Sequence, residues 1–206
     1  MPLIRSTSDK PASSGADPDP AASLTSASPN ERWAAARAAA DVPASLPALV
    51  QALAHESQSR VREALFTALA RIATPESALA ALPYLKSDDA NIRTCALDSL
   101  RAMPEAAKPH LPQMLADADA DVRLLACDLV RNIRDAEPRW LCALLEIEHE
   151  ANVCAAAVEV LAEIGDVQAL PTLWRCAARF PNDPFLAFAI KVAADRIRVH
   201  SLGPCG

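Results

Sequence analysis

A three-residue phrase recurs along the chain and decides the fold. It reads Arg60-Val61-Arg62, then Asn91-Ile92-Arg93, Asp121-Val122-Arg123 and Asn152-Val153-Cys154. The branched residues at its centre are 31, 30 and 31 positions apart. A period in this range is typical of a solenoid, in which each short structural unit packs only on its neighbours. The sequence therefore predicts a repeat array rather than a single closed core.

Apolar side chains recur at fixed offsets after each phrase. They stand zero, five, eight and eleven positions from the branched residue, which places them on one face of a helix. The four sets are Val61, Phe66, Leu69 and Ile72; Ile92, Leu97, Leu100 and Met103; Val122, Cys127, Val130 and Ile133; and Val153, Val158, Leu161 and Ile164. We call the helix that follows each phrase the B helix and the helix before it the A helix.

The helical pattern divides into hairpins of one A and one B helix. A first helix, capped by Asn30 and ending near Ala40, precedes them. The pairs are expected at 44–72, 75–103, 106–134, 138–165 and 167–198. Pro83 and Pro112 lie inside A helices and predict kinks or late starts. In the last pair Asp183-Pro184-Phe185 replaces the phrase, which is typical of a terminal repeat. We predict an all-α, right-handed α-solenoid of about five pairs plus an N-terminal helix.

Three segments differ in composition. Residues 1–28 contain Pro, Ser and Asp without a helical stripe, so we expect a disordered N-terminal tail. Residues 29–198 form the solenoid, and residues 199–206 form a C-terminal tail. Cys205 lies in this last segment and is the thiol most open to reaction by position, although an unstructured end explains it equally well.

The composition argues against several classes of function. The chain has four glycines and no phosphate-cradling loop. Its formal net charge of −6 argues against nucleic acid as a partner. No apolar run is long enough to span a membrane. The six cysteines form no Cys-x-x-Cys pair, which favours reduced thiols and a cytoplasmic location.

Candidate catalytic and metal-binding residues are sparse. Glu146 and His149 have the Glu-x-x-His spacing of helical metal sites, but such sites need a second motif and further carboxylates. The chain has no second Glu-x-x-His, so a solvated helix end explains the pair better. No nucleophile elbow or zinc-protease motif occurs. We predict no metal, no cofactor and no enzymatic activity.

These residues resemble the HEAT-repeat family, in its short bacterial form found in bilin-lyase-like proteins. The resembling features are Leu-Pro steps in the A helices, an acidic turn, and Val-Arg opening an Ala-rich B helix. The resemblance implies a ladder of hydrogen-bonded charges between turn acids and B-helix arginines. Its expected members are Glu56, Arg62, Asp88, Arg93, Asp117 and Arg123. Cys154 replaces the arginine of the fourth pair, so the ladder should weaken there.

A second set of residues is expected on the exposed side of the B helices. Six and nine positions after the branched residue the side chains are mainly charged, and Leu124 adds an apolar one. The set is Thr67, Asp98, Arg101, Leu124, Asp128, Arg131 and Glu159. Helical spacing predicts that Asp98 pairs with Arg101, and Asp128 with Arg131. The charges either solvate a helix face or form a groove for a partner protein on the concave side.

These features predict a non-catalytic adaptor, scaffold or regulator that binds another protein along the concave B helices. The alternative follows from the resemblance and is a lyase-like accessory factor that handles a chromophore or cofactor. Trp140 and Trp174 fall early in A helices, where packing between repeats explains them better than partner contact. If both were exposed, the convex side would be the better candidate.

Overall fold

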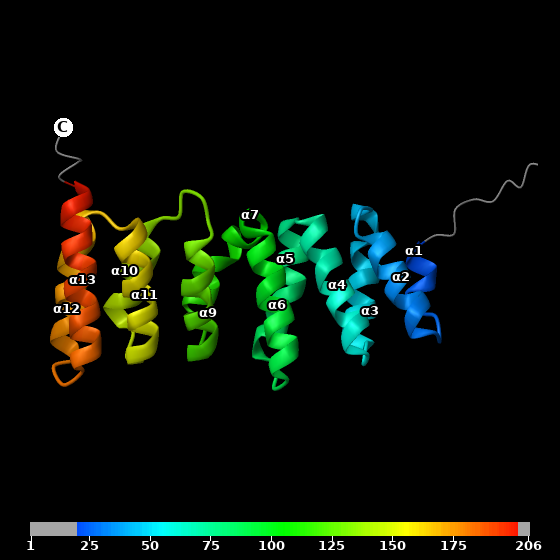
Figure 1. Ribbon diagram of the computed structural model, residues 1–206, viewed down its shortest axis with the longest axis horizontal. Helices are drawn as coiled ribbons and strands as arrows, with labels where there is room; N and C mark the ends of the chain where they lie inside the picture. The colour runs from blue at the N-terminus through cyan, green and yellow to red at the C-terminus, as the bar shows by residue number, and fades with distance from the viewer. Residues whose placement is uncertain (1–19, 202–206) are drawn as a thin grey trace, which may run out of the picture.

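The helices follow one another in a single row from α1 at one end to α13 at the other (Figure 1). The computed structural model describes residues 20–201. The predictions made for residues 1–19 and 202–206, Cys205 included, lie outside them. Within residues 20–201 every regular element is helical. The predicted all-α solenoid is therefore confirmed.

The elements have the following bounds. The α-helices are α1 (Pro20–Ser23), α2 (Pro29–Ala39), α3 (Leu46–His55), α4 (Ser59–Ile72), α5 (Pro75–Ala81), α6 (Ala90–Ala102), α7 (Pro104–Ala107), α8 (Leu111–Leu115), α9 (Ala120–Arg131), α10 (Pro138–Ile147), α11 (Ala151–Ile164), α12 (Leu170–Arg179) and α13 (Pro184–Ser201). The 3₁₀ segments are η1 (Pro43–Ser45), η2 (Leu82–Lys86), η3 (Lys108–His110) and η4 (Val167–Ala169). No helix in the described range has both the length and the apolarity to cross a membrane.

Two layers of helices make up the solenoid. The B layer contains α2, α4, α6, α9, α11 and α13, and each of these helices packs on the next. The A helices α3, α5, α8, α10 and α12 each pack on the B helix of their own pair. The observed pairs run over 43–72, 75–102, 104–131, 138–164 and 167–201, within three residues of the expected bounds.

Local sequence explains where the helices begin. Thr74 caps α5 reciprocally: its hydroxyl accepts from the Ser77 N–H, and the Ser77 hydroxyl accepts from the Thr74 N–H. Asp89 and Asp119 cap α6 and α9 with carboxylates that accept from the backbone two residues on. Proline occupies the first turn of α2, α5 and α10, where its missing N–H leaves no helical bond unmade.

The two prolines inside the A helices interrupt them, as the sequence predicts. α5 ends at Ala81 and continues as η2, which contains Pro83. Pro112 stands in the first turn of α8, directly after η3. Because proline cannot donate the helical hydrogen bond and clashes with the preceding turn, the backbone tightens or restarts at these points.

Three expectations about the ends of the solenoid are wrong. Ser28, not Asn30, caps α2: its hydroxyl accepts from the Glu31 N–H, and Pro29 takes the first helical position. Part of the tail expected over residues 1–28 is ordered, because residues 20–28 contain α1 and Leu24 is buried in the core. α13 runs to Ser201, so the C-terminal tail does not begin at residue 199.

The core consists mainly of alanine and leucine. All sixteen positions of the recurring apolar pattern are buried or half-buried. Alanines allow neighbouring helices to approach closely, and fully buried leucines such as Leu65, Leu100 and Leu161 fill the space between them. Phe66 is the aromatic member and packs edge-on against Tyr84, with ring centroids 5.4 Å apart. This packing leaves the outward sides of the B helices as a continuous surface.

Candidate functional site

The outward side of the B layer, which we call the B face, has charges that link neighbouring helix pairs. Its residues include Thr67, Asp98, Arg101, Leu124, Asp128, Arg131 and Glu159. Arg101 of α6 donates to Asp128 of α9 from Nε at 2.8 Å and from Nη2 at 2.7 Å. It also donates from Nη1 to Asp98 at 3.1 Å. Arg131 of α9 lies 3.4 Å from Glu159 of α11. Each arginine thus reaches forward to the next B helix.

The pairing differs in part from the one expected within single helices. Asp98 and Arg101 do pair within α6. Asp128 binds Arg101 rather than Arg131, whose partners are two carboxylates of α11. The hydrogen bond that Arg101 donates to Asp128 raises the pKa of Arg101 above its ordinary value. Because both arginines are already bound to carboxylates, the stretch of the B face from α6 to α11 presents an excess of negative charge.

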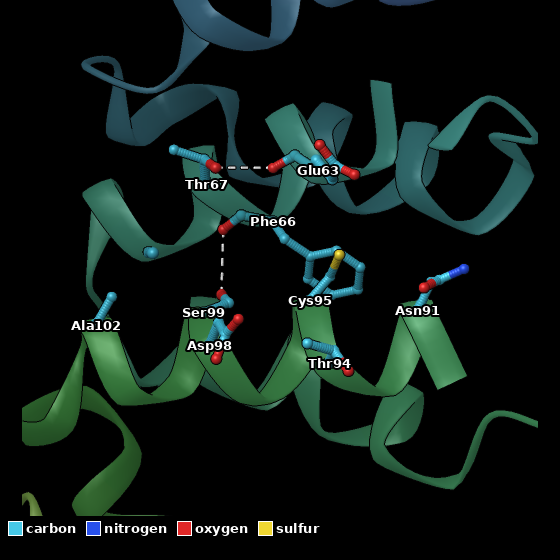
Figure 2. Close-up of a pocket in the computed structure, with 10 residues that line it drawn as sticks. Glu63, Phe66, Thr67, Asn91, Thr94, Cys95, Asp98, Ser99 and Ala102 are labelled. Carbon is cyan, nitrogen blue, oxygen red and sulfur yellow. Dashed lines mark hydrogen bonds between the residues drawn. The ribbon is translucent and has the colours of Figure 1, made fainter. Parts of the chain in front are cut away.

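A groove of about 510 Å³ lies between α4 and α6 on the B face (Figure 2). Thr67 of α4 and Asp98 of α6 line it on opposite sides. The Thr67 hydroxyl donates to the Glu63 carbonyl at 2.8 Å. The Ser99 hydroxyl of α6 donates to the Phe66 carbonyl of α4 at 3.1 Å and ties the two walls together. Short polar side chains therefore border an open groove between the two helices.

The cysteine in this groove is not an activated nucleophile. Burial raises the pKa of the Cys95 thiol, and the carboxylates of Glu63 and Asp98 raise it further. Burial also raises the pKa of Cys127 to about 12. Such thiols are protonated at neutral pH, whereas a catalytic cysteine must supply a thiolate. Packing accounts for both residues.

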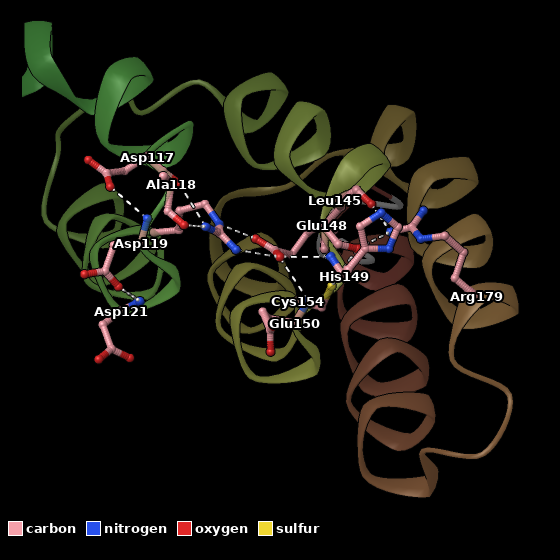
Figure 3. A network of polar contacts seen from close by, with 11 residues as sticks. Asp117, Ala118, Asp119, Asp121, Leu145, Glu148, His149, Glu150, Cys154 and Arg179 are labelled. Carbon is pink, nitrogen blue, oxygen red and sulfur yellow. Dashed lines mark hydrogen bonds and ion pairs between the residues drawn. The ribbon is translucent and has the colours of Figure 1, made fainter.

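A second network, the ladder, closes the turns between A and B helices. Arg123 donates to Glu148 from Nε at 2.6 Å and from Nη2 at 2.9 Å, and its Nη1 donates to two carbonyls of its own turn. Figure 3 shows Glu148 at the start of α11, where it accepts from the N–H groups of His149 and Glu150. One buried carboxylate thus joins two successive repeats and holds the turn that precedes α11.

The first turn repeats this geometry. Arg32 donates to Glu56 at 2.7 and 3.0 Å, and Glu56 accepts from the two N–H groups that follow it. The hydrogen bond from Arg32 holds the pKa of Glu56 below its usual range. For Glu148, burial alone would raise the pKa, but the donors from Arg123 and the backbone outweigh it and lower the pKa.

The inner rungs use partners other than those expected. Arg62 lies 3.7 Å from Asp89, the residue after Asp88. Asp88 contributes its backbone carbonyl, which accepts from Arg93 at 3.1 Å. Arg93 makes a second bond to the Ser87 carbonyl at 2.6 Å and so closes its own turn instead of linking repeats. In this turn the acids Asp88 and Asp89 stand four and three residues before the branched residue, not five. The arginines therefore meet backbone carbonyls or a different carboxylate.

The expected ladder lacked two of its members, Glu148 and Arg32. The expected acid Asp117 binds Lys86 at 2.8 Å, and Glu148 is the carboxylate that binds Arg123. Glu148 could have been found, since it stands five residues before the branched residue of its repeat. Arg32 was harder to find, because Glu31 takes the place of the branched residue before it.

Arg179 occupies the position that Cys154 leaves without an arginine. In other turns the B-helix arginine donates to the carbonyl six residues before it. The Cys154 thiol reaches the matching Glu148 carbonyl only at 3.9 Å. Arg179 of α12 donates to that carbonyl at 3.3 Å and also to the Leu145 carbonyl (Figure 3). The turn expected to be weak is closed from the following repeat.

Glu146 and the two tryptophans have structural surroundings. Glu146 accepts from Thr172 at 2.8 Å and from Arg175, both on α12, rather than forming a metal site with His149. Within residues 20–201 no group of three His, Cys, Asp or Glu side chains could hold a metal ion. Trp140 is half-buried and Trp174 is 43% exposed, so the two are not both exposed. The condition for preferring the A layer as the partner-binding side is therefore not met.

Acid is expected to weaken the fold through its paired carboxylates. Hydrogen bonds from Arg175 and Thr172 lower the pKa of Glu146 to about 2. A carboxyl whose folded pKa lies below its unfolded value stabilises the fold above the unfolded value and loses this contribution as the pH falls. The free energy of unfolding, measured in urea, should fall from about pH 4.5 towards pH 2. Glu146→Gln should show a shallower fall, and a parallel fall would contradict the assignment.

The row of A and B hairpins, with arginine–carboxylate turns between them, defines an α-solenoid of interaction-scaffold type. The chain belongs to the HEAT-repeat family: the family model for HEAT repeats matches residues 19–101, 46–128 and 107–191. The resemblance inferred from the recurring phrase is thereby confirmed. No curated protein matches the chain.

Several solved structures are similar in fold. The archaeal HEAT-like repeats protein from Thermococcus onnurineus has a TM-score of 0.51 at 14% identity, over 87% of this chain and 86% of that one. A designed armadillo repeat protein has a TM-score of 0.48 at 16% identity, over 86% and 98%. The complex of CpcE and CpcF of phycocyanin lyase from Nostoc has a TM-score of 0.39 at 17% identity, over 94% and 100%. At these identities the likeness concerns the fold alone.

Proposed function

We propose that this HEAT-repeat chain is a non-catalytic adaptor, scaffold or regulator that binds a partner protein along the concave B face. The observation that carries the proposal is the alignment of exposed side chains across successive B helices beside an open groove. Stacked helical repeats present one long surface of this kind rather than an enclosed pocket. A reducing, cytoplasmic setting is part of the proposal and fits the free thiols of the described cysteines.

The charges of the B face favour a protein partner over nucleic acid. Over α6, α9 and α11, Asp98, Asp128 and Glu159 outnumber Arg101 and Arg131, and each of these arginines is already bound to a carboxylate. A phosphate backbone would therefore meet net negative charge, which opposes its binding. Lysine and arginine side chains of a protein partner would be attracted instead, and their spacing would set the register of the partner along the repeats.

Filling the groove between α4 and α6 should abolish partner capture. Thr94 is exposed inside the groove, and Ala143 is exposed on α10 in the A layer. Thr94→Trp and Ala143→Trp each place an indole at an exposed helical site, so each should change the free energy of unfolding by at most about 0.5 kcal/mol. Proteins that co-purify with tagged chains from the native cell would be quantified by mass spectrometry.

We expect capture to fall at least about ten-fold with Thr94→Trp and to persist with Ala143→Trp. Equal recovery of co-purifying proteins with the unmodified chain, Thr94→Trp and Ala143→Trp would contradict a binding surface at this groove. Loss confined to Ala143→Trp would place the partner on the A layer.

A further inference from the structure

The last B helix, α13, can be compared position by position with α11. The first backbone bond of α11 runs from the Cys154 N–H to the Glu150 carbonyl, and that of α13 from the Ala187 N–H to the Asp183 carbonyl. The two helices therefore align with a shift of 33 residues, the difference between 150 and 183. Their buried faces agree in this register, since Val153 and Ala157 correspond to the buried Leu186 and Ile190.

The open end of the solenoid is suited to water. Cys154, Val158 and Ala162 are buried in α11, which has α13 packed beside it. The corresponding Ala187, Lys191 and Asp195 of α13 are exposed, and no further helix follows α13 among residues 20–201. Lys191 and Asp195 make two of these three positions polar, which suits a solvent-facing side of a repeat. Lys191 and Asp195 thus suit the side of α13 on which no other helix of residues 20–201 packs.

The B face of α13 is more apolar than that of α11. Asn152 and Glu159 of α11 correspond to Phe185 and Val192, and the small Ala155 corresponds to Phe188. Phe185 is 71% exposed and Phe188 is 66% exposed. Keeping such rings in water forgoes about 1.5–3 kcal/mol of burial for each side chain. Being at the end of the array does not explain them, because they lie on the B face rather than on the open end.

These apolar residues continue a row on the neighbouring helices. Leu124 of α9 and Ala155 of α11 stand at the same helix position as Phe188, and α9, α11 and α13 pack side by side. We call these three residues the apolar lane. Carboxylates border it on α9 and α11. They are Asp121, Asp128 and Glu159. Within residues 20–201 the Asp121 carboxylate has no hydrogen-bonded or ion-paired side chain.

We propose that the apolar lane binds a basic amphipathic segment of the partner protein. Apolar side chains of that segment would cover Leu124 and the ring of Phe188, with Phe185 at one edge. Its lysines or arginines would face Asp121 and Glu159. This inference rests on the proposed function and specifies the chemistry of the partner. Neighbouring helices lie roughly 8–10 Å apart, so apolar residues two helical turns apart in the segment would meet successive B helices.

Charge complementarity selects this occupant over a second copy of the chain. Two lanes related by a two-fold axis at α11 would bring the Glu159 carboxylates of the two copies together, which opposes association. A segment with basic flanks would instead neutralise the acids while it covers the phenylalanine rings. The apolar residues and the carboxylates lie in one row. A single ligand with both apolar and basic side chains would therefore match the whole row.

The test uses fluorescent helical peptides of about 18 residues, long enough for five turns. One peptide combines leucine with lysine, a second leucine with glutamate, and a third serine with lysine. Binding to the full chain is measured by fluorescence anisotropy. The variant is Phe185→Ser with Phe188→Ser, and the matched control is Leu79→Ser. Leu79 is a 53% exposed residue of α5 in the A layer. All these positions are exposed, so the variants should melt at the temperature of the unmodified chain.

We expect the leucine–lysine peptide to bind, and the other two to bind at least about ten-fold more weakly. The phenylalanine variant should lose at least about ten-fold in affinity, and Leu79→Ser should lose none. Equal binding of the leucine–glutamate peptide, or unchanged affinity of the phenylalanine variant, would overturn the inference. So would a dimer in light scattering that the phenylalanine variant converts to monomer, because a second copy would then be the occupant.

Failure here is distinguishable from failure of the proposed function. Partner capture through the groove between α4 and α6 is measured with Thr94→Trp, a change two B helices away from α11 and three from α13. If capture depends on Thr94 while the peptides do not discriminate, the apolar lane is refuted and the B-face function stands.

Discussion

Replacing Glu148 with alanine is expected to lower the free energy of unfolding by about 3–5 kcal/mol. The Glu148 side chain is buried and accepts from Nε and Nη2 of Arg123 and from two N–H groups of the turn before α11. Its removal leaves the partly buried Arg123 guanidinium without its ion-pair partner, and leaves two N–H groups of the turn before α11 without their acceptor. The effect is large because a single carboxylate serves two repeats.

Urea denaturation followed by circular dichroism measures this loss. Glu150→Ala is the matched control, since Glu150 is an exposed acid two residues away and should change stability by at most about 0.5 kcal/mol. Combining Glu148→Ala with Arg123→Ala should cost less than the sum of the two, because each change alone strands the other group. A loss below about 1 kcal/mol for Glu148→Ala would show that the ladder contributes little.

Replacing Gly165 with valine is expected to cost about 3 kcal/mol. Gly165 ends α11, and its N–H donates to the Leu161 carbonyl at 2.8 Å. A Cβ atom on Gly165 would lie 2.4 Å from that carbonyl oxygen and 3.1 Å from a methyl group of Ile197 on α13. The first contact is with backbone, so α11 or η4 must shift to relieve it. The requirement for glycine here comes from close approach rather than from an unusual backbone angle.

The same denaturation measurement tests the glycine, with Gln168→Ala as the control. Gln168 is an exposed residue of η4, three positions on, and its side chain should contribute at most about 0.5 kcal/mol. Gly165→Ala should already destabilise, since the clash begins at Cβ. Unchanged stability of Gly165→Ala would mean that the end of α11 adapts without cost.

The repeat architecture could be predicted because it depends on local periodicity. The spacing of Val61, Ile92, Val122 and Val153 predicts the pairs, and the apolar offsets predict their buried faces. Both follow from helix geometry within one repeat. Proline positions likewise predict the interruptions of the A helices, since proline acts on its own turn.

Contacts between repeats could not be predicted in the same way. Period and face place Arg131 near Asp128, but the stagger between α9 and α11 brings it to Glu159 instead. Arg179 lies 31 residues from the Glu148 carbonyl that it binds and belongs to no recurring phrase. A side chain as long as arginine can reach acceptors on several helices. Which acceptor it binds depends on packing distances that the sequence does not contain.

The apolar B face of α13 could not be predicted from the sequence for another reason. Asp183-Pro184-Phe185 departs from the phrase, so the terminal repeat has no branched residue from which to count. Phe185 and Phe188 then read as candidates for the core, because aromatic residues are usually buried. The structure shows that both rings are exposed. This exposure identifies them as part of the surface and not of the core.

Site-specific photo-cross-linking with the native partner tests the central claim most directly. A benzophenone side chain would be placed in turn at Thr94 and Ala155 on the B face, and at Leu79 and Ala143 on the A layer. The account predicts cross-links to the partner from the two B-face positions and none from the A layer. Cross-links confined to Leu79 and Ala143 would contradict it and place the partner on the opposite side of the solenoid.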